Sequence, residues 1–519
     1  MMKPFMMINL ILFIFSILCC VLIRNFTTLL LFVLCSLPTL VLNCWLVPGG
    51  FAWRNYTTKM TSCERRDGPV GLPLLGTLPQ MMGSLAHRKL AVMASSLGAQ
   101  RLMPLSLGST RVVISSHPET AKEILCSSNF SDRPIKESAR LLMFERAVGF
   151  APSGDHWRHL RRLAATHLFS PKKISALEPI RHRLAEEMAR KIEESSKMHG
   201  VVELRGIIQK GSLGNMLESL FGSCLSEEQK YELGLMVNEG YELITKFNLE
   251  DHFPMVRFLD IYGVKRKCQN LAVRVQSLLG QILKERREGS HGDDFLTSLI
   301  SLSEEDQLAD ADVISVLWEM MFRGTDTVAI LLEWIMARLV LHQDVQANLR
   351  REIVTCVGDH RHVRDSDVPK LRYLHAVVKE VLRLHPPGPL LSWARLAVHD
   401  VHVDKFLVPA GTTAMVNMWA ITHDPTVWKN PWAFRPSRFL EDDDVLIMGS
   451  DLRLAPFGSG RRVCPGKALG LATVHLWVAR LLQRFDWLPA EPVDLSENLR
   501  MSLEMKKPLK CQVRTRVRY

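Results

Sequence analysis

Hydrophobic and polar positions divide the chain into an apolar beginning and a long body with helical periodicity. Residues 5–23 carry no charge and residues 26–47 are nearly as apolar, and each run is close to the ~20 residues that cross a bilayer. A cleaved signal peptide would have an apolar region of only ~7 to 15 residues. We therefore expect residues 1–50 to be an N-terminal transmembrane anchor, either one span with an embedded segment or a two-span hairpin.

Basic residues follow the apolar runs at Arg54, Lys59, Arg65 and Arg66. By the positive-inside rule they place the downstream chain in the cytosol. Proline and glycine are frequent up to residue 79, which is typical of a stiff connection. We expect a hinge over residues 51–80 and one catalytic domain over residues 81–519.

The body of the chain combines long helical patterns with short strand patterns. Residues 101–116 predict two strands that turn at Gly108 and Ser109, and residues 401–418 predict further strands. The longest helical pattern runs from Ala311 to about His342 and is apolar nearly all round, which is typical of a core helix. The expected fold class is mainly α with small β-sheets (α+β).

Composition leaves the class of protein open but narrows its chemistry. Of 519 residues, 47% are hydrophobic and 23% charged, and the 11 cysteines are scattered without a C-x-x-C pair. This pattern argues against zinc, iron–sulfur and disulfide frameworks and fits a reducing compartment. A cysteine with a chemical role must therefore be identified from its local context.

The stretch APFGSGRRVCPGKALG, residues 455–470, supplies such a context around Cys464. A dinucleotide fingerprint would need a third glycine where Val463 stands. A phosphate loop would need a glycine at Arg461 and a hydroxyl at Ala468. The loop is therefore built for something other than a nucleotide.

A thiolate metal ligand at Cys464 explains the residues around it. Pro465 predicts the first turn of a helix, whose positive end lowers the pKa of a nearby thiol. Gly458 and Gly460 would let the main chain lie close under a flat cofactor, and Arg462 would pair with a carboxylate on its rim. A heme meets all of these requirements.

The segment FGSGRRVCPG matches F-x-x-G-x-R-x-C-x-G and resembles the heme-binding signature of the cytochrome P-450 superfamily, as residues 65–519 do as a whole. The resemblance implies the cytochrome P-450 fold with heme b (iron protoporphyrin IX) and Cys464 as the ligand of the metal. Phe457, Arg462 and Gly466 are the other cofactor-binding positions of this loop.

Two further motifs match the same family. In VVKEVLRLHPP, Glu380 and Arg383 share a helix face, and Arg438 of FRPSRF joins them. The resemblance implies that this trio is a structural support for the cysteine loop. Trp157 and Arg161 match W-x-x-x-R, whose members bind heme propionates, and Arg395 resembles another propionate contact.

The middle of the long helical pattern holds the polar segment RGTDT, residues 323–327. A glycine costs ~1 kcal/mol in a helix interior, and threonine can bond back to its own turn. The segment resembles the oxygen-activation motif of the family, which implies that Asp326 and Thr327 are catalytic and relay protons to oxygen. Arg323 replaces the usual small residue, and we expect it to point away from the heme.

Longer stretches around these motifs resemble plant family seventy-eight, subfamily A. The resemblance implies an NADPH- and O2-dependent monooxygenase of the endoplasmic reticulum membrane, with its catalytic domain in the cytosol. It also implies an NADPH-cytochrome reductase as partner, a hydrophobic, fatty-acid-like substrate, a role in plant growth or organ size, and no binding of nucleic acid.

Two rival functions stay open. A heme-thiolate isomerase or dehydratase would rearrange lipid hydroperoxides without O2 or a reductase, although the Asp326–Thr327 pair argues against it. A non-catalytic heme-binding sensor is the rival from another class.

The net charge of +11 also has two interpretations. Basic residues flank the heme motifs on what we expect to be one face: Arg158, Arg162, Arg453, Arg461 and Lys467. They would attract either an acidic electron donor or an anionic membrane surface.

Overall fold

The computed structural model describes residues 46–56, 67–83, 85–246, 248–253, 260, 262–289, 292–358, 360–391, 394–441, 445–449 and 451–516. The predicted anchor lies almost wholly outside these ranges, as do residues 57–66 of the predicted hinge, so both boundaries stay predictions. Within the described ranges, no helix combines the length and the apolar character that crossing a bilayer requires.

Helices make up most of the described chain, as the periodicity predicts. The first half contains α3 (Leu78–Met81), α4 (Ala86–Ser96), α5 (Pro118–Cys126), α6 (Glu137–Leu141), α7 (Asp155–His167), α8 (Pro171–Ala176), α9 (Glu178–His199), α10 (Leu204–Phe221) and α11 (Glu227–Thr245). The second half contains α12 (Val264–Glu288), α13 (Phe295–Ile300), α14 (Asp310–Leu341), α15 (Gln343–Val357), α16 (Arg372–Leu384), α17 (Met418–Thr422), α18 (Arg438–Glu441) and α19 (Lys467–Arg484).

The strands form small sheets. Their bounds are β1 (Met103–Leu107), β2 (Thr110–Ser115), β3 (Val202–Glu203), β4 (Arg395–Leu396), β5 (Val401–Val403), β6 (Phe406–Val408), β7 (Thr413–Val416), β8 (Phe485–Pro489), β9 (Glu497–Leu499), β10 (Leu503–Met505) and β11 (Lys510–Thr515). The four-stranded sheet has the order β1-β2-β7-β4, in which β2 and β7 are parallel. The other sheets are β3-β11-β8, β5-β6 and β9-β10.

The predicted turn at Gly108 and Ser109 is confirmed, because β1 ends and β2 begins on either side of it. Leu107 pairs with Thr110 in an antiparallel register. Gly108 has a φ of 59°, a left-handed conformation that glycine adopts without strain.

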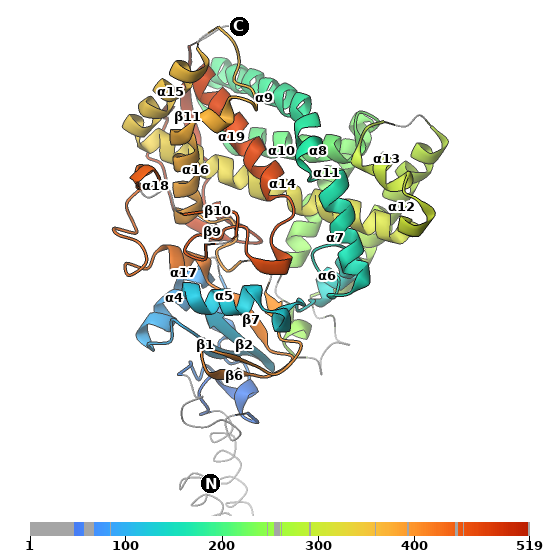
Figure 1. Ribbon diagram of the computed structural model, residues 1–519, viewed down its shortest axis with the longest axis vertical. Helices are drawn as coiled ribbons and strands as arrows, with labels where there is room; N and C mark the ends of the chain where they lie inside the picture. Colours follow the sequence, from blue (N-terminus) through green and yellow to red (C-terminus); the bar gives the residue numbers. More distant parts are fainter. Residues whose placement is uncertain are drawn as a thin grey trace, which may run out of the picture.

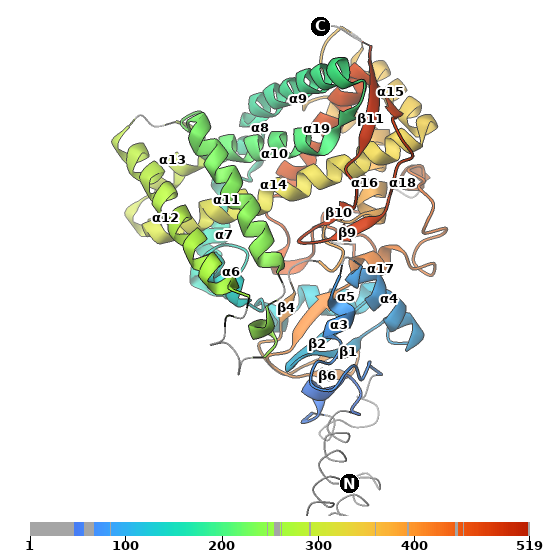
Figure 2. The same ribbon diagram turned by 180° about the vertical axis from the view of Figure 1, so that it is seen from behind.

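Helix α14 lies in the core, as its apolar character predicts. Figure 2 shows it passing through the middle of the helical part of the molecule. It packs against α10, α16 and α19, and its buried side chains belong to the two largest apolar clusters of the described chain. The helix is continuous through residues 323–327, so the polar segment does not interrupt it.

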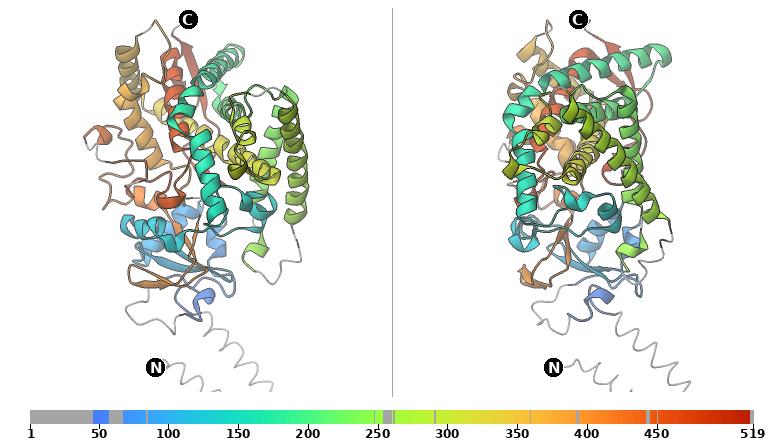
Figure 3. Two further views of the ribbon diagram at one scale, coloured as in Figure 1. Left: turned by 45° about the vertical axis from the view of Figure 1, so that its right-hand side comes forward. Right: turned by 90° about the vertical axis from the view of Figure 1, so that its right-hand side faces the viewer.

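The sheet with β1, β2 and β7 lies at one end of the molecule, and α9 and α15 lie at the opposite end (Figure 1). Both views of Figure 3 show this division between the strand-rich and the helical part. The loop that leads into α19 lies between the two parts, where side chains from both can meet.

Candidate functional site

The loop around Cys464 is held by its own backbone. The N–H of Cys464 donates to the carbonyl of Phe457 at 2.9 Å, which closes the loop on itself. Helix α19 begins at Lys467 with Gly466 as its N-cap, two residues later than Pro465 predicted. The corrected start still leaves Cys464 just before a helix N-terminus.

The two glycines of the loop have different roles. Gly458 (φ +72°) and Gly460 (φ +67°) both adopt left-handed conformations. A Cβ on Gly458 would meet no atom within 4 Å, whereas a Cβ on Gly460 would lie 2.2 Å from the carbonyl oxygen of Leu125. Gly460 therefore allows a close approach to α5, whereas the position of either glycine relative to the cofactor stays a prediction.

Arginines gather beside this loop, and we call Arg133, Arg161, Arg395 and Arg462 the arginine cluster. Burial is the largest cause that lowers the pKa of each, and repulsion by other arginines adds to it. The pKa of Arg395 and of Arg462 falls to about 10. A buried group of like charges is costly unless an anion neutralises it.

Trp157 and Arg462 lie together, as the resemblance implies. The guanidinium of Arg462 is 4.3 Å from the ring centre of Trp157. Arg462 donates to the carbonyls of Ser131 (2.9 Å) and Ala151 (2.6 Å), and Trp157 donates its indole N–H to the carbonyl of Val148 (3.0 Å). Both side chains therefore also fix the loop that precedes α7.

Arg161 and Arg395 bind the cysteine loop itself. Arg161 donates to the carbonyl of Val463, and the sulfur of Cys464 favours its positive charge. Arg395 donates to the carbonyl of Ser459 at 3.0 Å and is 4% exposed. The predicted cofactor-binding residues thus converge from α7, β4 and the loop before α19.

Arg133 belongs to the cluster, although the sequence analysis did not single it out. It is 8% exposed, and its pKa lies well below the ordinary value because of burial and of the charges of Arg395, Arg323 and Arg462. In the sequence Arg133 follows Asp132 in a polar stretch, where nothing distinguishes it from a surface arginine.

A short stripe of incompletely buried residues lies in the middle of helix α14. Between residues 312 and 337 of this helix every side chain is buried except those of Arg323, Gly324, Asp326, Thr327 and Val328. Neighbouring helices surround this part of α14, so its exposed positions face an internal cavity. Thr327 is exposed there, as a residue that acts on a bound molecule must be.

Asp326 lies against the β9–β10 hairpin. Burial is the main cause that raises the pKa of Asp326 to about 6, and the carboxylate of Glu504 raises it further. A hydrogen bond with the Ser502 side chain acts in the opposite direction. The acid and the alcohol of the predicted pair therefore face different surroundings.

A tyrosine that the sequence analysis missed contacts the same turn of α14. The hydroxyl of Tyr241 on α11 donates to the carbonyl of Phe322, and the backbone N–H of Asp326 bonds to the same phenol. The two rings of Tyr241 and Phe322 lie 4.4 Å apart. In a regular α-helix the carbonyl of Phe322 and the N–H of Asp326 form one backbone hydrogen bond. The hydroxyl of Tyr241 therefore contacts both groups of this backbone hydrogen bond.

Thr325 makes the backbone contact predicted for a helical threonine. Its hydroxyl donates to the carbonyl of Met321 at 2.8 Å, and its own carbonyl accepts from Ser212 of α10 at 2.6 Å. Gly324 allows this close packing, since a Cβ there would lie 2.0 Å from the Cε of Met216.

Arg323 does not point away from the site as predicted. Its guanidinium pairs with Glu319 at 3.1 Å, and its charge lowers the pKa of Arg133, Arg161 and Arg462. The i+4 spacing that places Arg323 on the face of Thr327 is the reason.

The trio Glu380, Arg383 and Arg438 is assembled. Arg383 binds both carboxylate oxygens of Glu380, at 2.8 and 2.9 Å, and Arg438 reaches the same carboxylate at 3.1 Å. The two arginines also donate to backbone carbonyls of residues 429–433. The trio therefore fixes residues 429–433, which precede the cysteine loop in the chain.

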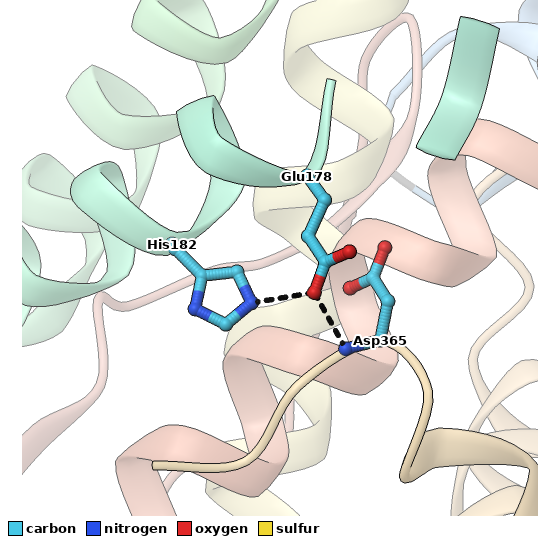
Figure 4. Close-up of side chains that lie close together, drawn as sticks. All are labelled: Glu178, His182 and Asp365. Atoms are coloured by element: carbon cyan, nitrogen blue, oxygen red, sulfur yellow. Dashed lines mark hydrogen bonds and ion pairs between the residues drawn. The ribbon is translucent and has the colours of Figure 1, made fainter. Parts of the chain in front are cut away.

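A separate group of metal-type side chains consists of Glu178, His182 and Asp365 (Figure 4). Nε2 of His182 lies 3.1 Å from Glu178, while Arg480 donates to its Nδ1 at 2.6 Å and Arg181 pairs with Asp365. Because Nδ1 accepts, the proton is on Nε2, and neither nitrogen is open to a metal. This group is a structural network.

The basic face expected beside the heme motifs is partly neutralised. Arg158 pairs with Asp155, Arg162 with Asp306, and Arg453 with Asp451. Lys467 donates to the carbonyl of Met448 at 2.7 Å. Arg461 is exposed.

These residues fit a heme. The thiol of Cys464 is a metal ligand when deprotonated, the buried arginine cluster calls for the two propionates, and the stripe of α14 faces the same cavity. A family model described as Cytochrome P450 matches residues 67–513.

The chain belongs to the cytochrome P450 family.

Curated relatives support this assignment. Cytochrome P450 78A5 of Arabidopsis thaliana is 51% identical over 90% of this chain and 92% of its own length. Cytochrome P450 78A3 of Glycine max is 49% identical over 92% of this chain and 93% of its own length. These names confirm the resemblance to family seventy-eight, subfamily A.

A solved structure titled "Zebra fish cytochrome P450 another structure with Progesterone" matches with a TM-score of 0.72 and 25% identity. The match covers 83% of this chain and 99% of that chain, so the cytochrome P450 fold is confirmed. The protein is accordingly a P450 monooxygenase with a cysteine-thiolate-ligated heme b. Membership implies O2, a redox-partner reductase and a small-molecule substrate.

Proposed function

We propose that this cytochrome P450 is a membrane-anchored hydroxylase of a hydrophobic, fatty-acid-like substrate. A separate NADPH-cytochrome reductase delivers two electrons from NADPH. One oxygen atom of O2 enters a C–H bond of the substrate, and the other leaves as water with two protons. The bound heme supplies the oxygen-activating chemistry.

The observation that carries the proposal is the position of Arg161 between two functional groups. Its positive charge is favoured by the sulfur of Cys464 and opposed by Arg323 on the exposed stripe of α14. The thiol and the face that presents Thr327 therefore lie near the same guanidinium. Thr327 can donate a hydrogen bond and pass on a proton there, which an oxygen-activating enzyme needs and a simple carrier of heme does not.

Aromatic side chains support a hydrophobic substrate. Phe144, which follows α6, packs with Phe150 and with Trp318 and Phe322 of α14 at ring-centre distances of 5.0 to 6.4 Å. These four side chains are 0 to 4% exposed, so they form the packed apolar core behind the stripe of α14, and such apolar surroundings suit a hydrophobic substrate.

Exposed apolar side chains support membrane attachment. Five of them lie on the segment that follows the predicted anchor, with 37 to 59% of their surface exposed: Leu72, Leu74, Leu75, Met82 and Leu85. Such a patch favours contact with lipid over contact with water. We place the protein in the endoplasmic reticulum membrane with its catalytic domain facing the cytosol, and protease protection of microsomes tests that placement.

The direct test uses the purified full-length protein, a plant reductase, NADPH and a panel of fatty acids, with products identified by mass spectrometry. We expect products heavier by one oxygen atom and dependent on both NADPH and O2. Conversion of a lipid hydroperoxide without NADPH would favour the isomerase, and no conversion of any fatty acid would contradict the proposed substrate class.

Cys464→Ala is the matched test of the site. We expect the variant to lose the thiolate signature in the spectrum of the reduced, carbon-monoxide-bound protein and to lose turnover. An unchanged spectrum would assign the ligand to another residue.

The resemblance to subfamily A also leads us to propose a role in plant growth or organ size. A loss-of-function plant complemented with the wild-type chain and with the Thr327→Ala variant tests this role. Organ size should recover with the wild type only.

A further inference from the structure

Arg323 occupies an unusual place for a charged residue. It lies near the middle of α14, among buried side chains of the core. Its side chain is 27% exposed, although neighbouring helices surround this part of α14. The exposed part belongs to the stripe that contains Thr327, one helical turn further on.

Two contacts fix the guanidinium at this place. Glu319, one turn earlier and 2% exposed, pairs with it at 3.1 Å. The same carboxylate accepts the backbone N–H of Gly149 through both oxygens, at 2.9 Å each. The loop before α7, the carboxylate and the guanidinium thus form one assembly at the wall of the cavity.

Gly149 is adapted to this assembly. A Cβ at this position would lie 2.0 Å from both Nη1 of Arg323 and Oε1 of Glu319. The loop can therefore approach the ion pair this closely only with glycine there.

The surroundings of Arg323 determine the charge that it attracts. Its guanidinium acts on Arg133, Arg161 and Arg462, all of which repel it. A cation is therefore disfavoured in this part of the cavity. A carboxylate meets both the positive charge and the planar donor geometry of a guanidinium.

We propose that Arg323 is a specificity-determining residue that binds the carboxylate of the substrate beside the stripe of α14 that contains Thr327. The inference rests on the proposed function and narrows its substrate class to carboxylic acids in their ionised form. Glu319 acts as a positioning residue that holds the guanidinium.

Binding to the ferric protein separates this inference from turnover. Dodecanoate and octadecanoate are compared with their methyl esters by titrating the spin-state change of the heme absorption in full-length protein. A charge-assisted pair predicts that each acid binds about tenfold more tightly than its ester. In Arg323→Gln the ratio should fall to about one, with affinity for the esters unchanged.

Two further variants complete the design. Arg323→Lys keeps the positive charge and should keep part of the preference for the acid. Arg351→Gln removes an exposed arginine of α15 that donates to the side chain of Asn348 at 3.1 Å, and it should leave the ratio unchanged. Heme content and the carbon-monoxide spectrum verify that each variant is folded.

Two results would overturn the inference: equal binding of acids and esters by the wild type, or an undiminished preference in a folded Arg323→Gln. Should that variant not retain heme, the wild-type ratio and Arg323→Lys still decide. Preferential binding of acids without any product would contradict the proposed hydroxylation and leave anion recognition standing.

Discussion

Thr327 and Asp326 are adjacent in the chain but stand in different environments. Thr327 is exposed, whereas Asp326 is half-buried, bonds with the side chain of Ser502 and is affected by the charge of Glu504. A hydroxyl at the cavity can serve as hydrogen-bond donor, and a carboxyl with a pKa of about 6 can exchange a proton near neutral pH. We therefore expect the two residues to have different roles in proton transfer.

Thr327→Ala should uncouple electron use from product formation. Removing the hydroxyl takes away a donor at the cavity but leaves the reductase interaction intact, so NADPH consumption continues and peroxide rises. We expect the yield of product per NADPH to fall about tenfold. This is less than the roughly 10²–10⁴-fold contribution of general acid–base catalysis. Thr325→Ala, which removes a hydroxyl bonded to Met321 within the helix, is the control and should stay coupled.

Asp326→Asn should change how stability depends on pH. Burial raises the pKa of this carboxyl from 3.8 to about 6 in the folded protein. The folded state therefore holds the proton more tightly, and the stability that this gives is present below pH 4 and is lost as pH rises through about 6. The full difference is roughly 3 kcal/mol.

The asparagine variant stays neutral at every pH, so its unfolding temperature should fall less than that of the wild type between pH 5 and pH 8. Thermal unfolding of the heme-loaded proteins measures this difference. Asp155→Asn, whose side chain is 99% exposed, is the matched control. Parallel curves for Asp326→Asn and wild type would contradict the raised pKa.

At the scale of elements, α14 works through contacts from its neighbours. Ser212 of α10 and Tyr241 of α11 each donate to a carbonyl of α14, at Thr325 and at Phe322. These bonds fall within the polar segment, where glycine and threonine weaken the helix. The shape of α14 around residues 322–325 thus depends on two other helices.

Tyr241→Phe tests this dependence. The ring contact with Phe322 remains, but the hydroxyl that meets both Phe322 and Asp326 is gone. Losing one net hydrogen bond of about 1 kcal/mol corresponds to about a fivefold effect, which we expect in the ratio of product to peroxide. Tyr231→Phe changes a 70% exposed residue of the same helix and should have no effect. An equal ratio of product to peroxide in the two variants would contradict a role of the Tyr241 hydroxyl.

At the scale of the whole molecule, the heme site joins the strand-rich part to the helical part. Arg395 begins β4 of the four-stranded sheet, whereas Arg161 belongs to α7 and Cys464 precedes α19. The arginine cluster gathers positive charge at this junction. A bound heme therefore neutralises charge and connects the two parts at once.

Removing the heme should lower stability markedly. Ligand binding contributes about 2.7 kcal/mol at a ligand concentration of 100 times Kd, and repulsion within the arginine cluster returns when the propionates leave. Calorimetry of the heme-free and heme-loaded protein measures the loss. In Arg133→Met we expect a smaller difference between the two forms, because one repelling charge is absent; an unfolding temperature independent of heme would contradict this account.

The sequence by itself determined the chemistry that depends on residue type and spacing. The surroundings of Cys464 and the trio Glu380, Arg383 and Arg438 were predicted, and the structure assembles the trio and places Arg161 on the cysteine loop. Metal ligation and ion pairing need particular side chains at short separations, so these requirements are visible in a single chain. The long core helix was predicted for a similar reason, because its periodicity is local.

Only the tertiary structure decided which way side chains face and which distant segments meet. It placed Arg133 in the arginine cluster, brought Tyr241 to α14 and turned Arg323 toward the site, against the prediction. It also assigned Gly460 to contact with α5. These outcomes follow from packing between segments far apart in sequence, where burial and charge are properties of the assembled molecule and not of any local pattern.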